Sequence, residues 1–107
     1  MKKSKLVYIA HPLTTHGTIG DNFKRIDAIC KELIVSNPDI VPVSPIHAFR
    51  FFDETKGDQE QVMGYCLNLL SACSELWLFG DREKSKGCMQ EVAFAVKNSM
   101  TILNKAG

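Results

Sequence analysis

Four short apolar runs alternate with segments of helical periodicity along the chain, and this order constrains the fold more than any other feature. The runs expected to be strands are rich in β-branched and aromatic residues: Lys5–Ala10, Asp39–Ser44, Glu75–Phe79 and Met100–Leu103. Neighbouring parallel strands need crossovers, and the segments between these runs carry helical patterns. The sequence therefore predicts an α/β protein of three α/β/α layers. We expect a Rossmann-like or flavodoxin-like doubly wound sheet of about four parallel strands.

Three longer segments have the spacing of helices. The first follows a loop at His11–Gly20, with Asp21 or Asn22 as its cap, and has apolar residues at Phe23, Ile26, Cys30, Leu33 and Ile34. The second is expected at Gln59–Cys73, and the third at Cys88–Lys97 with Val92, Ala95 and Val96 inward. A short helical turn is expected within Pro45–Phe52. Pro42 lacks a backbone donor, which either weakens the prediction of the second strand or puts that strand at an edge.

Composition narrows the class of protein. The 107 residues are 45% hydrophobic and 23% charged with a net charge of +1, which is typical of one compact domain over residues 1–107 rather than a disordered chain. Basic and acidic residues are interspersed, so we expect no nucleic-acid partner. A chain of this size has little room for a deep private cavity. A ligand site is therefore expected in a surface crevice or between subunits.

The N-terminal segment bears on the compartment. Its basic start precedes an apolar run, Leu6–Ala10, that is too short for a signal peptide or a spanning helix, so we expect a cytoplasmic protein with no membrane partner. The cysteines are then expected to be reduced thiols, at Cys30, Cys66, Cys73 and Cys88. They form no CxxC pair, and packing in the core is favoured over metal ligation.

Loops after the strands are the places where a ligand is expected, because open α/β sheets bind ligands at the carboxyl ends of their strands. They are His11–Gly20, Pro45–Phe52 and Gly80–Gly87. In the first, Thr14–Thr18 has hydroxyls and a glycine, which suits a phosphate turn, even that of a flavin, or a simple solvated loop. His11 and His47 could approach each other as stacking, hydrogen-bonding or structural groups, but two histidines make a poor zinc site.

Glu91 is the candidate for chemistry. It is expected in the first turn of the third helix, facing the crevice, where the helix N-terminus keeps it ionised as a nucleophile or electrostatic stabiliser. Gly87 permits close approach of a ligand to the backbone, and Ser85 can cap the helix or bind a hydroxyl. Acidic residues are also common in first turns without any function, so both readings stay open.

Three motifs carry a resemblance to a known family. They are LVYIAHP at Leu6–Pro12, VPVSPIH at Val41–His47 and CSELWLFGDREKSKGCMQEVAFA at Cys73–Ala95, with an asparagine-led helix at Asn22. Together they resemble the nucleoside 2-deoxyribosyltransferase-like superfamily, above all its small bacterial and phage branch, over nearly the whole chain. The loop with Ser85 and Gly87 and the helix with Glu91 are the most specific part.

The resemblance implies a function and a site. Glu91 would attack the anomeric carbon of a nucleoside or nucleoside 5′-monophosphate, and water or a second base would resolve the glycosyl ester. The substrate-binding residues implied are Ala10, His11, Pro12, Asn22, His47, Gly80, Asp81, Ser85 and Gly87. The resemblance implies no metal and no cofactor. It also implies a homodimer or larger homo-oligomer in which a neighbour closes the site.

The sequence departs from the family pattern in two motifs. His11 and Leu13 stand where a glycine and a tyrosine usually flank the first proline, and Ser74 stands where an aspartate often supports the sugar, with Glu75 beside it. These departures keep a second hypothesis open, in which the protein binds or sequesters a nucleotide without catalysis.

Overall fold

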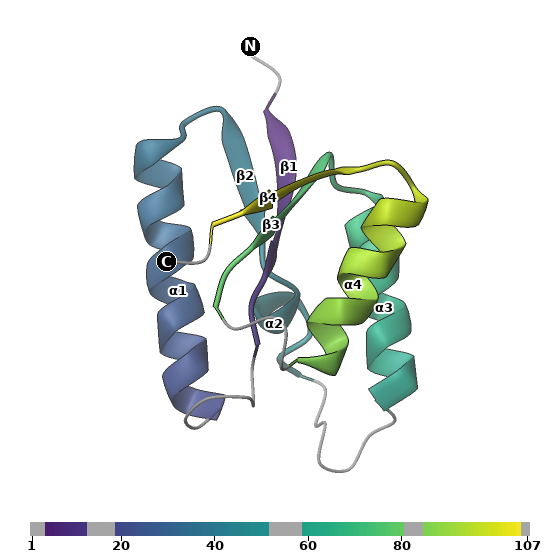
Figure 1. The fold of residues 1–107 in the computed structure, drawn as a ribbon. Coiled ribbons are helices and arrows are strands. Elements are labelled where there is room, and N and C mark those ends of the chain that lie inside the picture. Colours follow the sequence, from purple (N-terminus) through teal and green to yellow (C-terminus); the bar gives the residue numbers. More distant parts are fainter. Residues whose placement is uncertain (1–3, 13–18, 52–58, 81–84, 106–107) are drawn as a thin grey trace.

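The computed structural model describes residues 4–12, 19–51, 59–80 and 85–105, and strands and helices alternate in it as the sequence predicts (Figure 1). In chain order the elements are β1 (Lys5–Ala10), α1 (Ile19–Ser36), β2 (Ile40–Val43), α2 (Pro45–Ala48), α3 (Gln59–Ser71), β3 (Glu75–Leu78), α4 (Lys86–Lys97) and β4 (Thr101–Asn104). All neighbouring strands pair in parallel, in the order β2-β1-β3-β4. The predicted α/β class is confirmed.

The sheet is covered on both faces, which gives the three layers. Helix α1 lies on one side, and α3 and α4 lie on the other (Figure 1). Side chains alternate along β1 accordingly: Val7 and Ile9 pack with residues of α1, whereas Tyr8 and Ala10 pack with residues of α3 and α4. This alternation places neighbouring residues of one strand in two separate cores.

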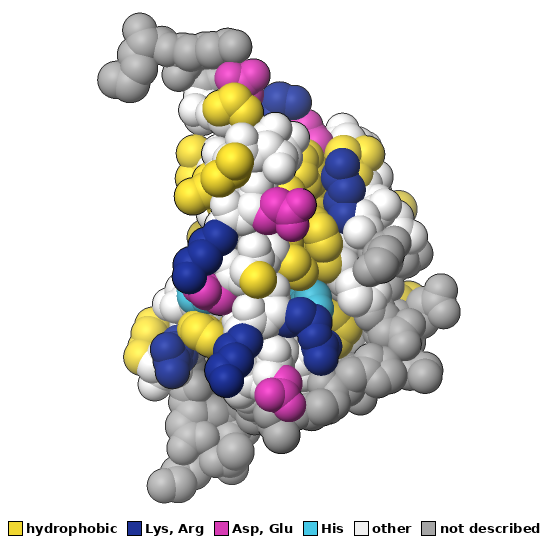
Figure 2. Space-filling view, turned by 90° about the vertical axis from the view of Figure 1, so that its left-hand side faces the viewer, with side chains coloured by type: hydrophobic (Ala, Val, Ile, Leu, Met, Phe, Trp, Pro, Cys, Tyr) yellow, Lys and Arg dark blue, Asp and Glu magenta, His cyan; other side chains and the backbone are white. Residues whose placement is uncertain are grey.

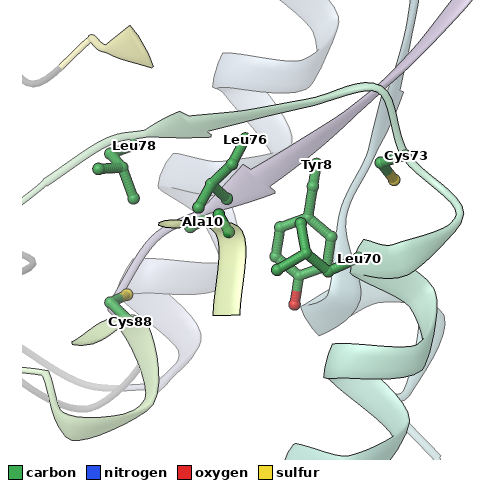
Figure 3. Close-up of a cluster of buried hydrophobic side chains, with 8 residues drawn as sticks. Tyr8, Ala10, Leu70, Cys73, Leu76, Leu78 and Cys88 are labelled. Carbon is green, nitrogen blue, oxygen red and sulfur yellow. The ribbon is translucent and has the colours of Figure 1, made fainter. Parts of the chain in front are cut away.

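The core between the sheet and the α3–α4 layer is the larger one. Figure 3 shows the Tyr8 ring beside Leu70 of α3, within a cluster that Leu76 and Leu78 of β3 complete from the sheet. Cys88 and Ala95 join the cluster from α4. An aromatic phenol therefore stands in the middle of an otherwise apolar layer.

The outer strand β2 contains Pro42, as the sequence predicts for an edge strand. At the edge of the sheet, β2 has a neighbour on one side only, so a missing backbone donor costs little there. The short helical turn is also confirmed, because α2 begins at Pro45 with Ser44 as its N-cap.

Three predictions of detail are wrong. Helix α1 begins at Ile19, so Asp21 and Asn22 lie in its first turn and do not cap it. Helix α4 begins at Lys86 rather than Cys88, because Ser85 accepts a hydrogen bond from the Cys88 backbone and sets the start. Val96 is 65% exposed, since the face of α4 that meets the sheet is centred on Ala95.

All four cysteines are free thiols, and Cys66, Cys73 and Cys88 are buried. The prediction that they pack in the core is confirmed for these three. Separately, no helix within the described ranges combines the length and the apolar character that crossing a bilayer requires.

Two valine-to-alanine changes test the assignment of inner and outer surfaces. Val7→Ala removes two methyl groups from a fully buried site and should lower the free energy of unfolding by about 2 kcal/mol. Val35→Ala in α1, at a side chain that is 81% exposed, should change it by less than about 0.5 kcal/mol. Urea unfolding measures both. Equal losses in the two variants would contradict the described core.

Candidate active site

The carboxyl ends of β1, β2 and β3 lie at the same end of the sheet because the strands are parallel. In Figure 1 this is the lower end, where α2 lies and where α1 and α4 begin. The chain runs from β1 to its neighbour β2 on one side, whereas β3 lies on the other side. The strand order therefore switches between β1 and β3, where a ligand crevice is expected.

Glu91 is buried at this end and bonded to the central strand. Its side chain is 5% exposed, and the fully buried Tyr8 of β1 donates a hydrogen bond from its hydroxyl to Oε2 of Glu91. Cys66 of α3 also forms a side-chain hydrogen bond with Tyr8. A carboxyl group, a phenol and a thiol from three elements thus meet in the α3–α4 layer.

Burial decides the charge of this group. Loss of hydration raises the pKa of Glu91 to about 7, although the hydrogen bond from Tyr8 lowers it in part. The pKa of Tyr8 is raised by burial first and by Glu91 and Cys66 next, so the phenol keeps its proton and remains the donor. The Tyr8 hydroxyl is therefore the hydrogen-bond donor of the pair, and the Glu91 carboxyl titrates near neutral pH.

Two predictions about Glu91 are corrected by this geometry. The residue lies in the second turn of α4, because the helix starts earlier than predicted. It is also not fully ionised at neutral pH, since desolvation outweighs the field of the helix N-terminus. The sequence did hold a signal for its burial: Cys88, Glu91 and Ala95 are spaced as one helical stripe, and all three are buried.

Tyr8 is the functional residue that the sequence reasoning missed. Its signal was a phenol within the apolar run of β1. A tyrosine hydroxyl needs a hydrogen-bond partner when it is buried. The partner of Tyr8 had to lie on a helix that covers the same face of the sheet as Tyr8. Knowing which helices cover that face required the order of the strands.

His11 and Gly80 meet where the crevice is expected. The His11 ring is buried against Gly80, where a Cβ atom would lie 3.1 Å from Nε2 and 3.0 Å from Cδ of Pro12. Gly80 has a φ of +72°, a conformation that other residues adopt at a cost. Ala10 is buried in the core, and its carbonyl accepts a hydrogen bond from the Phe79 backbone. Close packing against His11 and Pro12 and the positive φ together account for a glycine at position 80.

The tautomer of His11 follows from its contacts. Nδ1 lies 2.6 Å from the Pro12 carbonyl oxygen, which can only accept, so Nδ1 carries the hydrogen. Burial lowers the pKa of His11, the Pro12 hydrogen bond opposes this, and the charge of Arg25 lowers it further. The ring is therefore neutral at pH 7, and Nε2 is an acceptor.

Asn22 of α1 is buried and is hydrogen-bonded to the exposed Arg25. Its side chain is 1% exposed, and its Oδ1 accepts a hydrogen bond of 2.8 Å from Nη1 of Arg25. Asn22 was a predicted site residue, whereas Arg25 was missed. An arginine on the polar face of a helix has no sequence signal that separates it from a solvated one.

The structure gives His47 a different set of neighbours. Its Nδ1 lies 2.7 Å from Ser44 Oγ, its Nε2 lies 3.5 Å from Asp27 Oδ1, and its ring stands 4.3 Å from that of Phe23. These contacts join α2 to α1. The two histidines are thus each held by their own partners, and His47 has a structural role at the edge of the site.

The loop before α4 is described in part. Ser85 caps the helix, as one of its two predicted roles required, and Gly87 faces Met63 of α3, whose Cε would lie 3.2 Å from an added Cβ. Asp81 and the Thr14–Thr18 segment lie outside the described residues. Within the described ranges, no three His, Cys, Asp or Glu side chains gather as a metal site would require.

Ser74 directly precedes β3, and Glu75 is its first residue. They stand at the amino end of β3, where Glu75 pairs with Lys5 at 2.8 Å and accepts a hydrogen bond from Trp77 Nε1 at 3.0 Å. These contacts, with the hydrogen bond from the Ser74 backbone N–H to the Leu6 carbonyl at 2.8 Å, hold the start of β3 beside β1.

Comparisons with known proteins agree with the fold. A model of the DUF7768 family, described as a domain of unknown function, matches residues 5–105, and the chain belongs to this family. No curated protein matches it. A solved structure of "2-desoxiribosyltransferase from Leishmania mexicana" is similar with a TM-score of 0.66 and 18% identity, over 95% of this chain and 64% of the other. The chain thus has the nucleoside 2-deoxyribosyltransferase-like fold and spans about 64% of that transferase's length.

The raised pKa of Glu91 predicts a pH-dependent stability. From the ordinary value of 4.5 up to about 7, the folded state holds a proton that the unfolded state releases, so the contribution of Glu91 is fully present below pH 4.5 and lost as pH rises to 7. Relative to Glu91→Gln, the wild-type protein should lose on the order of 3 kcal/mol across this window. Urea unfolding at a series of pH values measures it, with the exposed Glu32→Gln as control. A difference that does not vary with pH would contradict the burial of Glu91.

Proposed function

We propose that the protein cleaves or transfers the N-glycosidic bond of a nucleoside or nucleoside 5′-monophosphate, with Glu91 as the nucleophile. The observation that carries the proposal is the buried Glu91–Tyr8 pair between α4 and the central strand. A carboxylate there can stabilise positive charge at an anomeric carbon and can also bond to it. The shared fold with a 2-desoxiribosyltransferase supports the same chemistry.

The reaction needs Glu91 in its ionised form. A lone pair of its carboxylate forms a bond to C1′ of the sugar, while the C1′–N bond breaks and its electron pair leaves with the base. Water or a second base then attacks C1′ and frees the carboxylate. Tyr8 holds the carboxyl in place and, by donating to it, favours the ionised form.

Two of the proposed binding residues have groups that can hydrogen-bond a substrate. His11 Nε2, as an acceptor, can receive a hydrogen bond from a sugar hydroxyl or a base N–H. Ser85 accepts from the Cys88 backbone, and its own hydroxyl hydrogen is a donor for a sugar oxygen or phosphate. The other residues proposed to bind the substrate are Ala10, Pro12, Asn22, His47, Gly80, Asp81 and Gly87. A second copy of the chain is proposed to close the crevice.

Removal of the nucleophile is the first test. Glu91→Gln should lower the rate of base release by at least about 1000-fold, because an amide cannot form the glycosyl ester. Purified protein is incubated with a panel of nucleosides and 5′-monophosphates, and free base is followed by chromatography. Glu32→Gln, an exposed change of the same kind, should keep the wild-type rate. Unchanged release by Glu91→Gln would exclude this mechanism.

The pH profile is the second test. The wild-type kcat/KM should rise with pH through about 7, because only ionised Glu91 attacks. Tyr8→Phe removes the hydrogen bond that lowers the pKa of Glu91, so the acidic limb should move to higher pH. Tyr65→Phe, at an exposed tyrosine of α3, should leave the limb in place. A limb that does not move in Tyr8→Phe would show that the pair does not set the active protonation state.

A nucleotide-binding module without catalysis is the second candidate. It is favoured by one observation: a carboxyl group with a pKa of about 7 is half protonated at neutral pH and is then a poor nucleophile. In that case calorimetry would detect nucleotide binding with no base released, and Glu91→Gln would keep the affinity. Release of base by the wild-type protein decides against it.

A further inference from the structure

We propose that Arg25 stabilises the negative charge that the base acquires as it leaves the sugar. This assignment rests on the proposed N-glycosidic reaction and adds a leaving-group site to it. The class of substrate that it favours has a base with a hydrogen-bond acceptor near the scissile nitrogen. The assignment depends on the hydrogen bond by which Asn22 holds the guanidinium of Arg25, and on the side of β1 on which Arg25 lies.

Asn22 fixes Arg25 without neutralising it. The amide oxygen of a side chain that is only 1% exposed accepts from Nη1 at 2.8 Å, so one donor of the guanidinium is tied to a rigid, buried group. An amide carries no charge, and the full cation remains. Arg25 itself is exposed, so its other donors can meet a ligand.

Arg25 and Glu91 lie on opposite sides of the central strand. Glu91 joins Tyr8 in the α3–α4 layer, whereas Arg25 belongs to α1, which packs on the Val7 and Ile9 side of β1. Helices α1 and α4 both begin at the carboxyl end of the sheet (Figure 1), and Arg25 and Glu91 each lie in the second turn of their helix. The charge of Arg25 also lowers the pKa of His11, the residue that directly follows β1. A substrate placed over the end of β1 would thus have an anion on one side and a cation on the other.

The surface on the α1 side has the charge that this role needs. Figure 2 faces the left-hand side of Figure 1 and shows Lys and Arg side chains gathered over the lower half of this face, beside histidine. Lys24, Arg25 and Arg50 are exposed, and the Arg50 guanidinium lies 4.4 Å from the centre of the Phe23 ring. The protein as a whole carries a charge of only +1, so the gathering is local.

The charges match those of the breaking bond. As the C1′–N bond breaks, the sugar becomes positive and the electron pair moves onto the base. Glu91 bonds to C1′ on its side, and Arg25 keeps its proton throughout and hydrogen-bonds the base anion on the other. Solvent then protonates the base. Fixed charges aimed at a developing charge are a large source of catalysis.

Leaving-group dependence distinguishes this role from a structural one. Arg25→Gln should slow release of a poor leaving base by about 10- to 100-fold and slow an acidic analogue much less, because the acidic base needs less stabilisation. Suitable pairs are 2′-deoxyuridine with 5-fluoro-2′-deoxyuridine, or deoxyguanosine with its 8-aza analogue. Lys24→Gln, which removes the adjacent exposed charge, is the matched control. Equal slowing of both substrates, or none, would overturn the assignment.

A binding measurement separates this proposal from the proposed function. Calorimetry with free 5-fluorouracil, below and above the ionisation of its ring N–H, should show tighter binding of the anion to the wild-type protein and to Lys24→Gln. Arg25→Gln should lose this preference while keeping the wild-type melting temperature. If the wild-type protein releases no base, the proposed reaction fails, and this experiment still decides on Arg25. No preference for the anion in the wild-type protein, or an undiminished one in Arg25→Gln, would overturn it.

Discussion

The hydrogen bond from Tyr8 to Glu91 joins the central strand to α4 inside an apolar layer, and both the fold and the site depend on it. A buried hydroxyl or carboxyl without a partner costs about 1–3 kcal/mol, so each group makes the burial of the other tolerable. Cys66 adds a third polar group from α3. The same contact that seats α4 on the sheet thus sets the charge and direction of the carboxyl.

The architecture could be predicted from the sequence because it depends on local periodicity. The order of strands and helices, the edge position of Pro42 and the burial of three cysteines follow from spacing and from single-residue chemistry. The start of α4 could not be fixed in the same way. Ser85 and Cys88 both suit a helix start, and only the backbone hydrogen bond to Ser85 chooses between them.

The site was predicted less completely than the fold because its chemistry depends on contacts between distant segments. Glu91 was found, but its pKa depends on how deeply α4 packs, which no local pattern reports. Tyr8 was missed because its partner Glu91 lies on another element. Arg25 was missed because only its hydrogen bond to the buried amide of Asn22 distinguishes it from a solvated arginine.

The place of β1 in the sheet has a consequence for biosynthesis. β1 is translated before β2 and β3, yet it lies between them, and its residue Val7 is opposite Glu75. One edge of β1 therefore stays open until β3 has been translated, and such an edge can pair with other chains. Glu91 emerges later still, in α4. The nascent chain thus completes the Tyr8–Glu91 pair only after α4 has been translated, and a chaperone that covers β1 would act on it before that point.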